Sequence, residues 1–252
     1  MTLEETLAQI KPLDKTAMEM AAKRWDSIAK PLHSLGKMEK LVIQIAGITG
    51  SADVSVKKRA LVPMCADNGV VEEGVTQTGQ EVTAIVAENF LSGATSACVM
   101  SHQCGTDVIP VDIGMVVDTK VPTDLKIACG TANMTKEPAM SREQAVQALE
   151  AGIEMVRRLK EEGYELLATG EMGIGNTTTS SAVAAVLLDR PAEEMTGRGA
   201  GLSGDGLTRK INAIKKAIEV NAPNPEDAID VLAKVGGFDI AGMAGMFLGG
   251  AA

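Results

Sequence analysis

The sequence feature that most constrains the fold is a glycine-rich turn within residues 164–188. An apolar run at Leu166–Ala168 precedes the turn and predicts a short strand, while Asn176 and the hydroxyl-rich run after it predict the start of a helix. The glycines of the turn follow the spacing G-x-x-G-x-G, and a single carboxylate, Glu171, lies among them. This succession of strand, tight turn and helix is typical of α/β proteins with parallel sheets.

Two interpretations of this turn follow from the residues alone. Glycines let the backbone approach a ligand closely, and a helix N-terminus attracts phosphate through its free N–H groups and dipole. We therefore expect residues 170–178 to hold a phosphorylated small molecule, with Glu171 beside its reacting atom. The alternative is an ordinary strand-to-helix turn in which Asn176 or Thr177 caps the helix. The glycine order differs from the dinucleotide-binding pattern, and the absence of a G-K-[ST] motif excludes a P-loop.

Composition excludes several other classes of function. The net charge of −9 and an aromatic content of 2% argue against nucleic acid or an anionic membrane as a partner. Four cysteines without a C-x-x-C pair and two histidines do not form a zinc pattern, and the closely spaced Cys98, His102 and Cys104 are expected on a half-buried helix. No signal peptide and no apolar run of membrane-spanning length is recognised. We expect a reduced, cytoplasmic protein with no metal and no cofactor.

The remaining chain alternates predicted helices and strands. Two helices split at Pro12 are expected in residues 2–30, followed by strands at Arg59–Ala66, at Asp107–Ile113 with Pro110 as a weak point, and at 125–128. Further helices are predicted at 37–48, at 81–103 with a weak point at Gly93, and from a capping box at Ser141 to Gly163. Another helix carries Thr208-Arg209-Lys210 and runs to about Val220, and a last one is predicted at 225–235. The pattern indicates a parallel sheet with helical crossovers.

Polar groups follow the predicted strands. Asp67-Asn68-Gly69 ends the first strand, where open α/β sheets bind ligands, although the same residues also suit a plain turn. A second glycine-rich loop, residues 197–206, precedes Lys210 on a helix; on pattern alone, a flexible connection with a solvated basic face is favoured there. The uncharged stretch 240–252 would leave an apolar helix bare, so we expect a further segment to be missing or supplied by a partner.

Several segments in order resemble the nicotinate-nucleotide:dimethylbenzimidazole phosphoribosyltransferase family, which activates the lower-ligand base of cobamides. The resemblance runs from about Lys30 to Ala252. The segments that carry it are Ser34-Leu35-Gly36, Cys65–Val70 with Glu73-Gly74-Val75, Pro138-Ala139-Met140-Ser141, Gly170–Thr178 and Val235-Gly236-Gly237-Phe238-Asp239.

The resemblance implies a fold, an assembly and a reaction. It implies a Rossmann-like α/β fold, with a parallel sheet and helices on both faces, over residues 51–252, and a small helical part of a second domain in residues 1–50. It also implies a homodimer without metal or cofactor. The reaction would move phosphoribose from nicotinate mononucleotide to a benzimidazole-type base, giving nicotinate and the α-riboside phosphate.

The resemblance also assigns roles to individual residues. Glu171 corresponds to the active-site carboxylate and Lys210 to a charged partner of the site. Asp67 and the loop 76–80, including Thr78 and Gln80, are expected near the base pocket. The expected ribose-phosphate contacts are Gly173, Asn176, Thr177, Thr178, Gly199 and Gly201.

The chain departs from the family pattern in ways that bear on the base and on catalysis. Leu32-His33 replaces a usual Pro-Gly, Asn68 replaces a common histidine, and Val86 lies near a position where some members have glutamine. A Leu-Gly-Glu-Gly motif, which carries the family's favoured base near the C-terminus, is absent. A fragment is therefore expected, with Glu171 acting alone as the other possibility. The competing functions are a non-catalytic nucleotide-binding subunit and a relative that acts on phenolic or purine bases.

Overall fold

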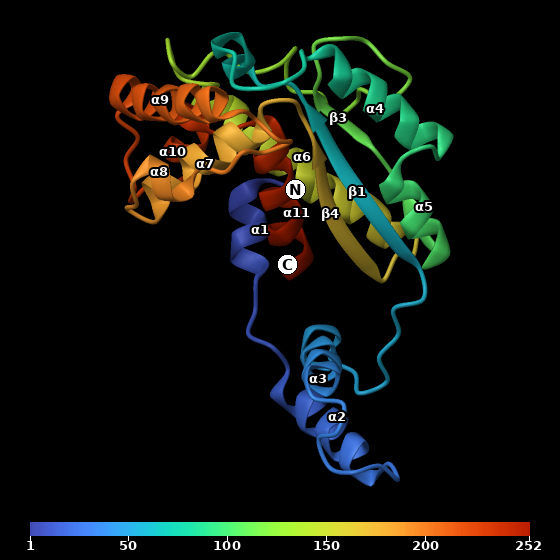
Figure 1. Ribbon diagram of the computed structural model, residues 1–252. Coiled ribbons are helices and arrows are strands. Elements are labelled where there is room, and N and C mark those ends of the chain that lie inside the picture. The colour runs from blue at the N-terminus through green and yellow to red at the C-terminus, as the bar shows by residue number, and fades with distance from the viewer.

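The computed structural model describes residues 1–252, which form a large α/β body and a protruding pair of helices (Figure 1). The body contains a sheet of short parallel strands, and the protruding pair is joined to it by two linkers. The helices are α1 (Leu3–Gln9), α2 (Lys15–Ser27), α3 (Lys37–Thr49), the 3-10 helix η1 (Gly69–Glu73), α4 (Glu81–Ser92), α5 (Ser96–Gln103), α6 (Arg142–Glu161), α7 (Asn176–Leu187), α8 (Ala192–Met195), α9 (Gly204–Asn221), α10 (Ala228–Val235) and α11 (Phe238–Ala251).

The sheet is built around β1 (Arg59–Ala66), which is the strand predicted at these residues. It pairs in parallel with β4 (Leu166–Met172) on one side and with β2 (Thr106–Val108) and β3 (Val111–Gly114) on the other. The register places Arg59 opposite Leu166 and Cys65 opposite Met172. The parallel sheet expected from the alternating pattern is therefore confirmed.

Two strand predictions need correction. The strand predicted at Asp107–Ile113 is divided into β2 and β3, because Pro110 has no N–H to donate to a ladder. The strand predicted at residues 125–128 is wrong. Ile127 donates one hydrogen bond to the Ile113 carbonyl at 3.1 Å, and no ladder follows.

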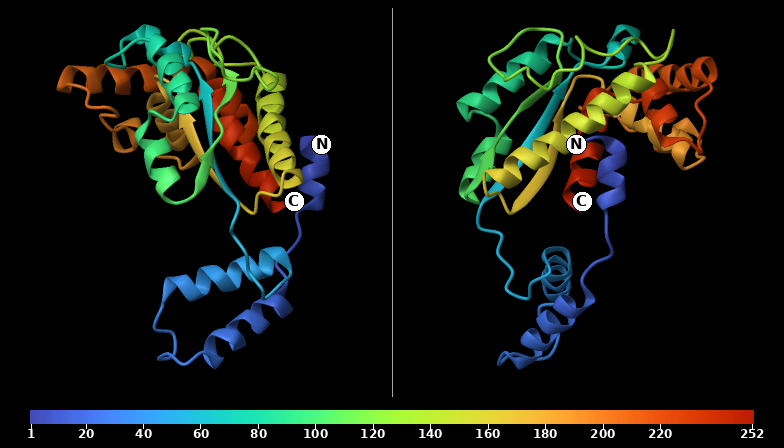
Figure 2. Two further views of the ribbon diagram at one scale, coloured as in Figure 1. Left: turned by 90° about the vertical axis from the view of Figure 1, so that its right-hand side faces the viewer. Right: turned by 180° about the vertical axis from the view of Figure 1, so that it is seen from behind.

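Helices cover both faces of the sheet, as the Rossmann-like expectation requires (Figure 2). The helices α4 and α5 lie against one face, and α11 lies against the other with α6 packed behind it. The helix predicted at 81–103 is two helices, because Gly93 ends α4 with a φ of +76° and Thr95 caps α5. Contrary to the sequence-based prediction, Glu81–Gln103 has the length and hydropathy of a membrane span, which alone is weak evidence for one.

The contact between α6 and α11 depends on glycine. A Cβ at Gly152 would lie 2.0 Å from the Gly242 carbonyl oxygen, and one at Gly245 would lie 1.9 Å from the Leu149 carbonyl oxygen. The two backbones therefore touch at a distance that only glycine allows. This close approach lets small residues and methionine fill a core in a chain with an aromatic content of only 2%.

The N-terminal helices divide differently from the predicted boundary at residue 50. The helix α1 packs on the body: Leu3 is buried in the main core, and its N–H donates to the Glu150 carboxylate at 2.9 Å. The helices α2 and α3 pack on each other, away from the body (Figure 1). Only these two helices, with the linkers on either side, form the separate helical part.

Candidate active site

The turn between β4 and α7 lies at the carboxyl edge of the sheet and has the predicted strand–turn–helix form. A Cβ at Gly173 would lie 2.3 Å from the Ala66 carbonyl oxygen, so this position excludes any larger residue. Gly175 has a φ of +95° and precedes the helix as its N-cap. The alternative in which Asn176 or Thr177 caps α7 is wrong, because no side chain makes that cap. The helix start is thus left without a side-chain cap, which suits an incoming anion.

The side chain of Lys210 on α9 points toward the start of α7. Its side chain is 1% exposed, and Nζ donates to Thr177 Oγ1 at 2.6 Å and to the Gly197 carbonyl at 3.2 Å. Burial lowers the pKa of Lys210 from its ordinary value. The favoured interpretation of a solvated basic helix face is therefore wrong for this lysine, which is a buried cation at the start of α7.

The second glycine-rich loop closes over this lysine. A Cβ at Gly199, whose φ is +54°, would lie 2.9 Å from Thr177 Oγ1 and 3.5 Å from Lys210 Nζ. The Gly201 carbonyl accepts a hydrogen bond from Gln77 Nε2 at 2.6 Å. The structure thus brings the two glycine-rich stretches, far apart in the sequence, around one buried amino group.

Glu171 lies next to this group of residues, five residues before the first residue of α7. Its carboxylate accepts a hydrogen bond from Asn176 Nδ2. Burial of the carboxyl, followed by the negative charge of Asp239, raises the pKa of Glu171 to about 7. The residue as a whole is exposed, so water reaches the side chain and screens part of this effect. A carboxyl that titrates near neutral pH can accept or donate a proton in a reaction.

The other residues predicted to contact the substrates range from fully buried to exposed. Asp67 is fully buried; its Oδ2 accepts from the Val116 N–H at 2.8 Å, and burial raises its pKa. Thr178 is buried, and its Oγ1 has no partner. Gln80 Nε2 donates to the Asn68 carbonyl at 3.2 Å, whereas Thr78 is exposed and its carbonyl accepts from Thr76.

Sequence reasoning gave no role to several residues that hold the turn in place. The Ile174 N–H donates to Thr83 Oγ1 at 3.1 Å, and the Thr83 hydroxyl in turn faces Asp67. Asn68 and Asp239 lie against Gly173 from the other side. The sequence signal for Asp239 is its place in the segment Val235-Gly236-Gly237-Phe238-Asp239, which carries part of the family resemblance but assigned Asp239 no role.

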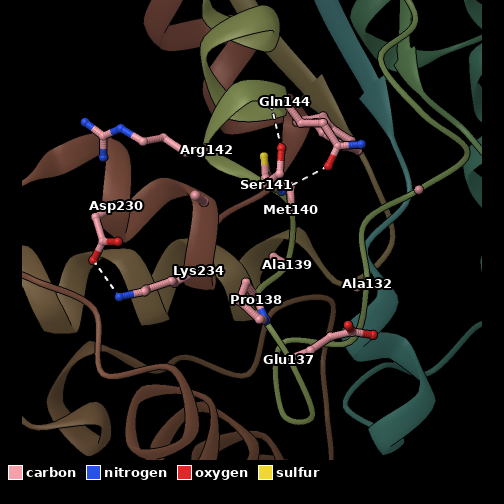
Figure 3. Close-up of a pocket in the computed structure, with 13 residues that line it drawn as sticks. Ala132, Glu137, Pro138, Ala139, Met140, Ser141, Arg142, Gln144, Asp230 and Lys234 are labelled. Atoms are coloured by element: carbon pink, nitrogen blue, oxygen red, sulfur yellow. Dashed lines mark hydrogen bonds and ion pairs between the residues drawn. The ribbon is translucent and has the colours of Figure 1, made fainter.

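A cavity lies elsewhere, between the loop 130–141 and α10 (Figure 3). Its volume is about 540 Å³, and none of the predicted site residues lines it. Its charged side chains are largely paired: Lys234 with Asp230 at 2.9 Å, and Arg142 with Asp227 at 2.8 Å. The Ser141–Gln144 capping box occupies the N-terminus of α6 at its wall. We therefore do not assign the chemistry to this cavity.

An uncapped helix start, a buried lysine and a titratable carboxylate at the carboxyl edge of a Rossmann-like sheet define an α/β enzyme suited to phosphorylated small molecules. Comparison with known families agrees with this class. The family model described as phosphoribosyltransferase matches residues 10–252. The chain belongs to this phosphoribosyltransferase family.

Individual relatives are similar over more than nine-tenths of the chain. A nicotinate-nucleotide–dimethylbenzimidazole phosphoribosyltransferase from Ruminiclostridium cellulolyticum is 54% identical, across 100% of this chain and 72% of that protein. One from Clostridium tetani is 51% identical, across 99% of this chain and 69% of that protein. The crystal structure of CobT from Thermus thermophilus matches with a TM-score of 0.85 and 37% identity, covering 92% of this chain and 70% of that one.

Proposed function

We propose that this chain transfers the phosphoribosyl group of nicotinate mononucleotide to 5,6-dimethylbenzimidazole or a similar base. The products are nicotinate and α-ribazole 5'-phosphate, an intermediate of cobalamin biosynthesis. The names and identities of the relatives support this pair of substrates. We place the reaction in the cytoplasm, where four free cysteines would stay reduced.

One observation carries the proposal: Lys210 Nζ lies 2.6 Å from Thr177 Oγ1 at the uncapped start of α7, with Glu171 just before that helix. The phosphate of the nucleotide would bind at the helix start, where the dipole and the buried ammonium group both favour an anion. Its ribose would lie toward Glu171. The groups that would surround the ribose and phosphate are Gly173, Asn176, Thr177, Thr178, Gly199 and Gly201.

The chemistry requires a base but no general acid. The bond between the anomeric carbon and the pyridinium nitrogen breaks, and nicotinate leaves with a neutral ring that needs no proton. A benzimidazole nitrogen forms the new bond on the opposite face, while the proton on the other nitrogen passes to Glu171. A carboxylate whose pKa is about 7 is a stronger base than an ordinary glutamate and is still ionised in about half of the molecules at pH 7.

The base would enter beside the loop 76–80. Gln80 and Gln77 tie this loop to Asn68 and Gly201 respectively, so the loop borders the nucleotide site on its open side. We propose that Thr78 and Gln80 contact the base and that buried Asp67 shapes its pocket from beneath. The assembly is a homodimer in this proposal.

A base-competition experiment tests the proposal. The pure chain is incubated with nicotinate mononucleotide and equal concentrations of dimethylbenzimidazole, adenine and phenol, and the ribosides are separated by chromatography. We expect α-ribazole phosphate as the main product. A dominant purine or phenolic riboside would assign the chain to a relative with another acceptor. Tight nucleotide binding without any riboside would favour a non-catalytic nucleotide-binding subunit.

A further inference from the structure

Asp239 is a fully buried acid at the start of α11 that the proposed reaction does not use directly. It is 0% exposed, and its Oδ1 accepts from the Ile240 N–H at 2.9 Å. Its Oδ2 is buried beside the Asn68 side chain, and a hydrogen bond from Asn68 lowers the pKa of the carboxyl against the effect of burial. A fully buried carboxylate is costly even when hydrogen-bonded, so its retention at this position calls for a reason.

The surroundings of Asp239 point toward the glycine turn. A Cβ at Gly173 would lie 3.0 Å from Asp239 Oδ2 and 3.1 Å from Asn68 Nδ2. On the other side, a Cβ at Gly237 would lie 2.3 Å from Asp239 Oδ1 and 2.6 Å from Asn68 Oδ1. Two glycines therefore make room for the Asp239 and Asn68 side chains directly beneath the turn that follows Glu171.

We propose that Asp239 is a positioning residue of the transferase site: its carboxylate supports the turn at Gly173 and places a second negative charge behind Glu171. The inference rests on the proposed function, because it assigns Asp239 the task of making Glu171 a better proton acceptor. Ionised Asp239 disfavours ionisation of Glu171 and so strengthens Glu171 as a base. Asp239 itself touches neither substrate.

The titration of the surrounding groups agrees with this geometry. Burial raises the pKa of Asp239 to about 6, and its charge adds to the burial that brings the pKa of Glu171 to about 7. The other titratable groups around Asp239 are Asp67, directly after β1, and Cys65, the penultimate residue of β1. Asp112 and Lys126 act on Asp67 from the β3 side with opposite signs. Asp239 therefore loses its proton at a lower pH than Glu171, so its charge is present when Glu171 titrates.

The test replaces the charge without changing the size of the side chain. In Asp239→Asn, the titration midpoint of Glu171 should move about one pH unit lower, because a nearby like charge is gone. The midpoint is followed by ¹³C NMR of glutamate-labelled protein, with the Glu171 signal assigned by its loss in Glu171→Gln. The acid limb of kcat against pH should move in the same direction. A purely structural role for Asp239 would move neither midpoint.

The matched control is Asp112→Asn, which removes another fully buried carboxylate at the same edge of the sheet. It should leave the Glu171 midpoint in place. An unchanged midpoint in Asp239→Asn, or an equal shift in Asp112→Asn, would overturn the inference. If Asp239→Asn does not fold, the Glu171 midpoint is measured in the unmodified protein. A midpoint near the ordinary value of a glutamate would also overturn the inference. The NMR titration needs no turnover, so an inactive chain with the shifted midpoint would contradict the proposed function alone.

Discussion

Glu171 is the residue on which the chemistry depends most. Glu171→Gln keeps the shape of the side chain but cannot accept a proton, so turnover should fall by about 10²-fold to 10⁴-fold. Binding of nicotinate mononucleotide, measured by calorimetry, should be largely unchanged. Glu88→Gln, on the exposed side of α4, is the control and should match the parent. Equal turnover in Glu171→Gln and the parent would remove Glu171 from the mechanism.

The raised pKa of Glu171 also sets the pH dependence. As a base Glu171 must be ionised, so kcat should decline as pH falls below about 7, and this limb should disappear in Glu171→Gln. Glu171 affects the free energy of unfolding in the opposite direction, since its contribution decreases as pH rises. The proton held by folded Glu171 stabilises the fold fully below its ordinary pKa of 4.5, and this contribution is lost as pH rises through about 7.

Lys210 should affect binding more than the chemical step. Lys210→Ala removes a buried cation that faces the start of α7, so affinity for the nucleotide should fall about tenfold or more. Lys216→Ala lies on the same helix, is exposed, and should leave the affinity unchanged. Calorimetric titration of both variants decides the matter. Retained affinity in Lys210→Ala would mean that the phosphate binds elsewhere.

At the scale of elements, the packing of α11 on α6 gives a sharp comparison. Gly245→Ala places a methyl group 1.9 Å from the Leu149 carbonyl oxygen, so the helices must separate, and we expect a loss of about 1–3 kcal/mol in the free energy of unfolding. Gly250→Ala on the same helix meets no atom within 4 Å and should be neutral or slightly stabilising. Urea unfolding of both variants measures this, and equal stabilities would contradict the close packing.

The elements also show how far sequence reasoning reaches. The strand β1, the capping box at Ser141 and the β4–α7 turn were predictable, because hydrophobic runs and glycine spacing are local signals. The burial of Lys210 was not, since it depends on a loop from residues 197–201 folding onto Thr177. Pro110 was predicted only as a weak point in one strand. The segment 125–128 runs beside the edge strand β3 but makes one hydrogen bond to it, from Ile127 to Ile113, instead of a ladder. Long-range placement, rather than local pattern, decides these cases.

The whole molecule presents apolar surface on its protruding helices. On α2 and α3 the exposed side chains include Met20 at 58%, Met38 at 58%, Leu41 at 55% and Ile48 at 58%. An apolar patch formed by such side chains would be buried by a second copy of the chain. We therefore predict a homodimer, with a mass by light scattering of twice the 26.2 kDa of one chain. A single-chain mass at micromolar concentration would contradict this part of the proposal.

A single-turnover experiment is the most direct test of phosphoribosyl transfer by this chain. Excess enzyme is mixed with nicotinate mononucleotide, with and without dimethylbenzimidazole, and the released nicotinate and α-ribazole phosphate are quantified over time. We expect one nicotinate and one α-ribazole phosphate per nucleotide, formed only when the base is present. Release of nicotinate in the absence of dimethylbenzimidazole would contradict transfer by this chain. So would the absence of nicotinate release when bound nucleotide and dimethylbenzimidazole are both present.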